Sequence, residues 1–177
     1  MGEAADAGRR GAIGQTEPPD SCYSGRVRYP TRIRLDHDAY RVRTTTFHGT
    51  VHAHPTVPRW SPLVGESIWR TVLEQRDRPR IELLAACLMP DHIHLLLRPC
   101  DGSVLDFLRT WKSWSTRQAW RAGHSGTLWQ PGMWDRTVRD FDDYVATRAY
   151  VLNNPVADGL VEHVEDWPWS WAQELEA

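Results

Sequence analysis

Hydrophobic and polar positions alternate along the chain with two different periods, and each period predicts one kind of element. Residues 32–54 are rich in Thr, Val, Tyr and Phe and alternate in polarity near their centre, which predicts one or two strands. Residues 81–99 contain two apolar stretches separated by Met89-Pro90-Asp91, which predicts two strands joined by a hinge. The second stretch, 92–98, has the continuous hydrophobicity of a central strand buried on both faces.

Three segments carry apolar residues at helical spacing. They cover residues 66–75, 104–121 and 140–154, and the third has acidic residues in its first turn and Pro155 as its predicted end. A short strand is predicted at 134–138. Strands and helices that alternate around a central hairpin predict an α+β fold, an α/β sandwich in which helices cover one face of an antiparallel sheet.

Length and composition fit one globular domain with a buried core. The chain has 177 residues, of which 41% are hydrophobic and 25% charged. No apolar run approaches the ~18–20 residues of a membrane span, so we expect a cytoplasmic protein without a membrane partner. Three scattered cysteines are too few for a disulfide framework or a zinc knuckle.

Charge divides the chain more clearly than hydrophobicity does. The net charge is −2, but residues 26–148 hold 19 basic and 13 acidic side chains, whereas 149–177 hold six acidic and no basic ones. A basic body with an acidic tail can still bind a polyanion on one face. We expect a disordered leader at 1–25, a main domain at 26–160 and an acidic, Trp-rich C-terminal segment at 161–177.

His92-Ile93-His94 is the clearest candidate for chemistry. Side chains two positions apart on a strand point to the same side, so both imidazoles share one face. Two neutral histidines held together can bind a divalent metal if a third ligand comes from elsewhere. The alternative is two hydrogen-bonded polar residues at a sheet edge, and this motif alone leaves both interpretations open.

Tyr150 and Asn154 form the second candidate. At ~100° per residue they lie about 40° apart, on one face of the predicted helix. A phenolic oxygen can attack phosphorus when a metal polarises the phosphate, and an amide oxygen can bind that metal. Taken alone, however, Tyr150 also fits a core residue and Asn154 an ordinary residue near a helix end.

Four motifs together resemble a known family. They are MPDHIHLLL at 89–97, LWQPGMWDRTVRD at 128–140, YVLNNPVADGLV at 150–161 and DWPWSW at 166–171. In this order they resemble the single-tyrosine HUH transposases, and the last motif resembles the branch associated with repetitive extragenic palindromes. The resemblance spans residues from about 40 to 171. It implies a ferredoxin-like fold and makes 26–160 the catalytic domain.

The resemblance also implies a reaction. His92, His94 and Asn154 would bind Mg²⁺ or Mn²⁺, and Tyr150 would be the nucleophile. The implied reaction cleaves single-stranded DNA and leaves a 5′-phosphotyrosine and a free 3′-OH. The implied substrate is a DNA hairpin with a short flanking guide sequence, and the enzyme would act as a monomer or homodimer. Asp91 departs from the family, which more often has Asn before the first histidine.

Basic and aromatic residues between the two motifs are candidates for DNA contact. The candidates are Arg109, Lys112, Arg117, Arg121, Trp129 and Trp134. Each is equally consistent with a solvated helix face or a core ring. His48, His52 and His54 are given no role beyond DNA contact.

Two other functions remain open at this stage. A hairpin-binding protein that no longer cuts DNA would not need the intact set of His92, His94, Tyr150 and Asn154. A structural zinc site built on the two histidines would lack a nearby cysteine pair.

Overall fold

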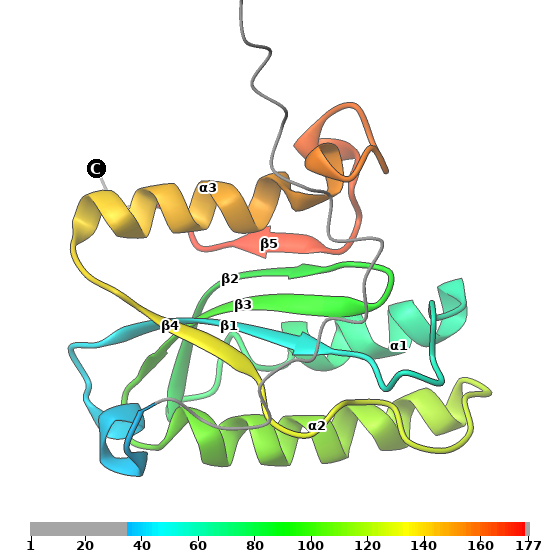
Figure 1. Cartoon of the computed structure of the whole chain (residues 1–177), viewed down its shortest axis with the longest axis horizontal. Coiled ribbons are helices and arrows are strands. Elements are labelled where there is room, and N and C mark those ends of the chain that lie inside the picture. Colours follow the sequence, from blue (N-terminus) through cyan, green and yellow to red (C-terminus); the bar gives the residue numbers. More distant parts are fainter. Residues whose placement is uncertain (1–34, 176–177) are drawn as a thin grey trace, which may run out of the picture.

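One antiparallel sheet forms the centre of the molecule (Figure 1). The structure is a computed structural model, and it describes residues 35–175, so the leader predicted at 1–25 lies outside the described residues. The five strands of the sheet are β1 (Thr46–His52), β2 (Ile81–Leu88), β3 (His92–Pro99), β4 (Trp134–Val138) and β5 (Ser170–Ala172). Their spatial order is β4-β1-β3-β2-β5. The hinge predicted at Met89-Pro90-Asp91 therefore joins two neighbouring strands.

Helices lie on both sides of this sheet (Figure 1). They are α1 (Pro62–Leu73), α2 (Val104–Arg121) and α3 (Phe141–Ala157), with short 3₁₀ helices η1 (His37–Arg41) and η2 (Val164–Asp166). The succession β1-α1-β2-β3-α2-β4 with the order β4-β1-β3-β2 is the ferredoxin-like arrangement, which confirms the predicted fold class. The prediction that helices cover one face holds for α1 and α2 and is corrected for α3.

Three details differ from the sequence prediction. Residues His37–Arg41 form a 3₁₀ helix rather than part of a strand. Pro155 lies inside α3 and does not end it, because a proline in the last turn removes only one helical hydrogen bond. Residues 161–177 were treated as a separate segment, but Ser170–Ala172 pairs with β2 as the edge strand β5.

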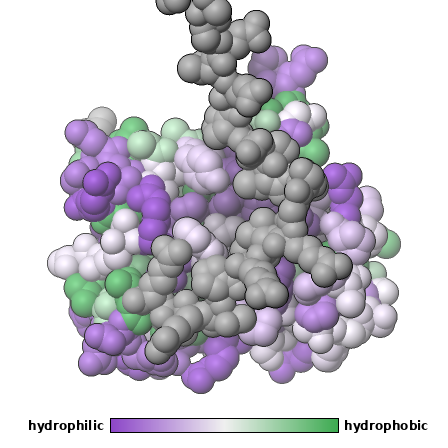
Figure 2. Space-filling view, viewed as in Figure 1, coloured by the Kyte–Doolittle hydropathy of each residue, from purple (hydrophilic) through white to green (hydrophobic). Residues whose placement is uncertain are grey.

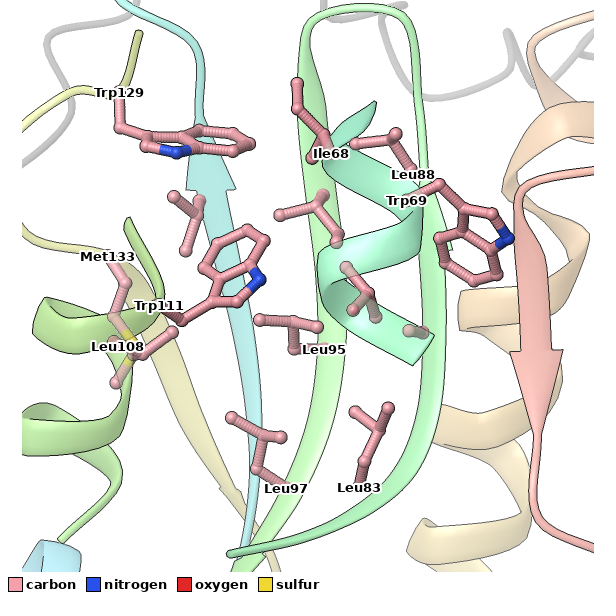
Figure 3. Packing of buried hydrophobic residues seen from close by; sticks show 14 of the residues in the cluster. Ile68, Trp69, Leu83, Leu88, Leu95, Leu97, Leu108, Trp111, Trp129 and Met133 are labelled. Atoms are coloured by element: carbon pink, nitrogen blue, oxygen red, sulfur yellow. The ribbon is translucent and has the colours of Figure 1, made fainter. Parts of the chain in front are cut away.

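The larger hydrophobic core lies between the sheet and the α1–α2 layer (Figure 3). It contains the four buried tryptophans Trp60, Trp69, Trp111 and Trp129, and several of their indole N–H groups are hydrogen-bonded inside the core. Trp111 donates to Thr71 Oγ1 over 3.0 Å, and Trp129 donates to Ser115 Oγ over 2.9 Å. Part of the unusual tryptophan content therefore serves packing.

A smaller core lies on the other face, under α3. Leu84, Cys87, Met89 and Leu96 of the β2–β3 hairpin pack there against Val151 of α3. Val151 is fully buried, so the turn of α3 that it occupies is fixed over the centre of the sheet.

No helix within 35–175 is long and apolar enough to cross a bilayer. In Figure 2 the hydrophobic residues form small separate patches among hydrophilic ones.

The C-terminal tryptophans join the two layers at the β5 edge. Trp167 Nε1 donates to the Leu88 carbonyl over 3.0 Å, and the Leu88 amide donates to the Trp169 carbonyl over 2.8 Å. The Trp169 ring lies directly over Gly65 of α1. A β-carbon at Gly65 would collide with Cη2 of this ring and would come within 2.9 Å of Cζ2 and Cζ3. The absence of a side chain at Gly65 thus makes room for this ring.

We expect Gly65→Ala to lower the free energy of unfolding by about 1–3 kcal/mol, because overpacking outweighs the ~1 kcal/mol by which Ala favours a helix. Urea unfolding monitored by circular dichroism measures this change. Gly102→Ala is the control, since a β-carbon there meets its nearest neighbour, in Arg80, at 3.4 Å. An unchanged or raised stability of Gly65→Ala would contradict the contact with Trp169.

Candidate functional site

The pairing of β1 with β3 places two rows of polar side chains next to each other. Thr50 lies opposite His94 in the antiparallel register. His52 lies opposite His92 in the same pairing. Because alternate side chains of a strand share a face, His48, Thr50 and His52 point to the same side as the two histidines of β3. This is the side that α3 covers.

His92 and His94 approach each other through their outer ring nitrogens. The two Nε2 atoms are 2.9 Å apart. His92 Nδ1 lies 2.7 Å from Asp91 Oδ1, so the carboxylate accepts the Nδ1 proton and leaves the Nε2 lone pair facing His94. His94 Nδ1 lies 3.2 Å from both Thr50 Oγ1 and His48 Nε2.

Burial keeps several of these imidazoles uncharged. Desolvation lowers the pKa of His94 well below its usual value, and the neighbouring histidines act in the same direction. Burial, assisted by the charge of Arg136, lowers the pKa of His48 to about 4. Burial also lowers the pKa of His52 to about 4. Neutral imidazoles are the form that binds metal ions.

The donor set fits a divalent cation. Two ligands on adjacent positions of an octahedral ion, each at about 2.1 Å, are separated by about 3 Å, and the His92 and His94 Nε2 atoms are 2.9 Å apart. The bond from His92 to Asp91 has the form of the outer-shell contacts that orient metal-binding histidines. Within residues 35–175 no group of three His, Cys, Asp or Glu side chains is placed to hold a metal. A further protein ligand would therefore have to be of another type.

Asn154 is a ligand of that other type, and α3 brings it to the site together with Tyr150. The Asn154 Nδ2 donates to the Tyr150 carbonyl over 2.6 Å, which leaves its amide oxygen as a neutral donor. The Asn154 side chain also reaches His94, where it partly opposes the lowering of the His94 pKa that burial causes. The structure thus brings both sequence motifs together.

Tyr150 lies against the histidines but stays open to solvent. Its ring centroid is 5.6 Å from that of His94 and 5.7 Å from that of His48, both in edge-to-face orientation. The Tyr150 side chain is 55% exposed, although Val151 next to it is buried. A phenol that is accessible and adjacent to a candidate metal site is placed to act as a nucleophile.

The basic residues of α2 lie in the other layer. Arg109, Lys112 and Arg117 line a groove of about 1090 Å³ between α2 and the loop at 126–133. Arg121 is exposed at the end of α2 and is not part of the groove lining. The groove therefore collects three of the four predicted cations.

Lys112 is a structural residue as well as a charge. Its Nζ donates to the carbonyls of Gln130 and Gly132, and its burial lowers its pKa to about 8. The charge of Lys112 contributes to the lowering of the His52 pKa, so its field extends to the site.

The two tryptophans proposed for base stacking have different environments. Trp129 is only 5% exposed and packs between Trp60 and Trp111, so its ring cannot take a base without unpacking the core, and we correct its role to packing. Trp134 is 41% exposed on the edge strand β4 and lines a hollow next to Tyr150.

A comparison with known protein families gives a match that spans these residues. A family model described as IS200-like transposase matches residues 52–164, the part of the chain that carries His92, His94, Tyr150 and Asn154. The chain belongs to the IS200-like transposase family.

Two individual relatives match about half of this chain at 34% identity. The REP-associated tyrosine transposase of Escherichia coli is 34% identical over 96 residues, which are 54% of this chain and 56% of that protein. A relative from Haemophilus influenzae is 34% identical over 102 residues, which are 50% of this chain and 57% of that protein. The chain thus matches little more than half the length of either relative.

A solved structure of a REP-associated tyrosine transposase bound to a REP hairpin has the same fold. It superposes with a TM-score of 0.53 at 24% identity, covering 78% of this chain and 91% of that one.

Sequence reasoning missed three contributors to the site. His48 and Thr50 contact His94, and Arg136 from β4 influences His48. The alternation of His48, Thr50 and His52 along one predicted strand was the available signal, because it places all three on one face. Only the pairing partner of that strand was unknown.

Acid should destabilise this site in the metal-free protein. The folded-state pKa values of His48 and His52 are about 4, below the ordinary 6.5, so between these values the unfolded chain binds more protons. Their contribution is full above pH 6.5 and is lost as the pH falls toward 4. We expect the free energy of unfolding to fall by about 2 kcal/mol for each of these two histidines from pH 7 to pH 5, measured by urea unfolding in EDTA.

The variant His48→Gln should show a smaller fall, because one of the histidines with a lowered pKa is gone. His163→Gln is the control, since His163 is exposed and lies outside this cluster. An equal fall in His48→Gln and the parent protein would show that His48 is not held neutral by burial.

Proposed function

We propose that this chain is a metal-dependent endonuclease and strand transferase that acts on single-stranded DNA at hairpins through a 5′-phosphotyrosine intermediate. One observation carries the proposal. The exposed ring of Tyr150 lies against His94, and the Nε2 of His94 is 2.9 Å from that of His92. A nucleophile and two nitrogen donors therefore share one small region, and neither a DNA-binding surface nor a structural metal site requires such a nucleophile.

The covalent step is a phosphoryl transfer. The Tyr150 oxygen forms a bond to phosphorus, the bond from phosphorus to the 3′-oxygen breaks, and that oxygen takes a proton from water to become a 3′-OH. The phenolic proton passes to solvent, to which Tyr150 is open. In the reverse sense a 3′-OH attacks the phosphotyrosine and releases Tyr150, so strand transfer needs no external energy source.

The chain's own residues would hold the metal and orient the phosphate. His92, His94 and Asn154 are the proposed ligands, and Asp91 fixes the ring of His92. A bound Mg²⁺ or Mn²⁺ would polarise the phosphate and offset the charge that develops on its oxygens. Tyr150 is kept in place meanwhile by the buried neighbour Val151.

The proposed partner is a DNA hairpin with an unpaired flank. The Escherichia coli relative is named a REP-associated tyrosine transposase, and a solved structure of a transposase of that name holds a REP hairpin. The groove lined by Arg109, Lys112 and Arg117 offers positive charge for the phosphates of such a partner. We propose a monomer or a homodimer as the acting form.

We expect Tyr150→Phe to abolish the covalent adduct while leaving DNA binding within about twofold, because only the attacking oxygen is removed. Denaturing gels of the protein with hairpin oligonucleotides from the DNA flanking its gene, in Mn²⁺ and in EDTA, measure the adduct. Tyr144→Phe on the same helix is the matched control and should retain it.

An adduct in Tyr150→Phe would disprove the role of Tyr150. A metal-independent mobility shift without any adduct in the parent protein would favour the second candidate, a hairpin-binding protein that does not cut. The exposed Tyr150 beside two neutral histidines argues against that candidate, because binding alone uses neither.

The proposed metal site gives a separate prediction that does not depend on cleavage. Asp91→Ala should weaken Mn²⁺ binding about tenfold or more, because His92 loses the partner that fixes its orientation. Asp91→Asn should restore most of the affinity, since an amide oxygen can accept the same hydrogen bond. Isothermal titration of the DNA-free protein measures both, with Asp101→Ala, an exposed partner of Arg43, as the control. Equal affinity in Asp91→Ala would remove Asp91 from the site.

A further inference from the structure

We propose that the hollow between β4 and Tyr150 binds one unpaired nucleotide of the DNA strand, next to the phosphate that Tyr150 attacks. This inference rests on the proposed function and adds a subsite to it. Trp134 would stack on the base, and Arg136 would contact the phosphate or sugar of the same nucleotide.

The hollow has the size and position that this role requires. Its volume is about 340 Å³, at the lower end of the ~300–1,000 Å³ of small-molecule sites. It is lined by His48, Thr50, Trp134, Asp135, Arg136 and Tyr150. A group in the hollow would therefore touch the candidate nucleophile directly, and two residues of the lining, His48 and Thr50, contact His94 of β3.

Strand alternation puts the two key side chains on one wall. Trp134 and Arg136 are two residues apart on β4, so both face the side of the sheet that carries Tyr150. Trp134 pairs with Thr50, and Arg136 pairs with His48, which brings the aromatic and the cationic group to the two ends of the same wall. An exposed indole can stack on a base, and a guanidinium two residues along the same strand can contact the phosphate or sugar of that nucleotide.

Arg136 is held in this position from α3. Its Nη1 donates to Asp143 Oδ1 over 3.0 Å, and its Nη2 donates to the Thr147 hydroxyl. No described residue accepts a hydrogen bond from its Nε. Asp143 also pairs with Arg139, so these three side chains carry a net charge of +1, which suits a phosphate.

The acidic member of the lining does not oppose an anion. Asp135 alternates with Trp134 and Arg136, so its side chain points through the sheet to the opposite face. There its carboxylate accepts a hydrogen bond from the Tyr40 hydroxyl over 2.8 Å and is 5% exposed. The side chain of Arg136 thus faces the hollow, whereas the carboxylate of Asp135 lies on the other side of the sheet.

Binding of short single-stranded oligodeoxynucleotides of mixed sequence tests the subsite. Fluorescence anisotropy is measured in EDTA on the Tyr150→Phe protein, so that cleavage plays no part, and a strand of equal length without bases is the second probe. Trp134→Ala should weaken binding of the base-containing strand about tenfold and leave the abasic strand unchanged. Arg136→Gln should weaken both strands. Trp134→Phe should recover most of the loss, which separates lost stacking from a damaged edge strand.

Two control variants lie outside the hollow. Phe141→Ala removes another exposed aromatic ring, and Arg70→Gln removes an exposed arginine of α1 on the other side of the sheet. Both should bind the two probes as the parent does. Unchanged binding in Trp134→Ala, an equal loss for both strands in that variant, or no binding of either probe to the parent would overturn the subsite. Absence of cleavage by the unmutated protein with these binding results intact would instead overturn the proposed function alone.

Discussion

The register between β1 and β3 is the constraint on which the site depends. It sets Thr50 opposite His94 and His52 opposite His92, and it does so because the alternate residues of both strands are needed in the core. Phe47 and Val51 of β1 face the α1–α2 layer, and a shift of one residue would send them to the side of α3. The packing of the larger core therefore also fixes which side chains meet on the side of the sheet that α3 covers.

A second, smaller set of contacts fixes the position of α3 on that face, so that Tyr150 lies next to His94. Val151 is buried against Leu96 and Cys87, and this leaves its neighbour Tyr150 at the rim, where one side of the ring meets His94 and the rest meets solvent. Arg136 ties β4 to α3 through Asp143, so the edge strand and the helix that carries Tyr150 are positioned together. The packing of Val151 on the β2–β3 hairpin and the ion pair between Arg136 and Asp143 together hold α3 in place.

Much of this could be predicted from the sequence, and the failures have physical reasons. The β2–β3 hairpin and α2 were predicted closely, because long apolar runs and clear helical spacing reflect local preference. The short strand β4 was also predicted at its observed residues. Pro155 misled the prediction, since a proline near a helix end costs little. β5 has three residues and depends on its pairing with β2, which no local pattern shows. His92, His94, Tyr150 and Asn154 came from motifs, whereas Arg136 and Thr50 reach the site only through strand pairing.

The buried histidines set the conditions under which this site could take a cation. Two Nε2 atoms 2.9 Å apart cannot both present lone pairs to each other, so in the metal-free protein a proton lies between them in a hydrogen bond. Asp91 takes the Nδ1 proton of His92, so the shared proton belongs to Nε2 of His94. A divalent ion would replace this hydrogen bond, and the His94 proton would move to Nδ1, which faces Thr50 Oγ1 and His48 Nε2. The same desolvation that destabilises the metal-free protein in acid keeps from His94 the second proton that would compete with such an ion.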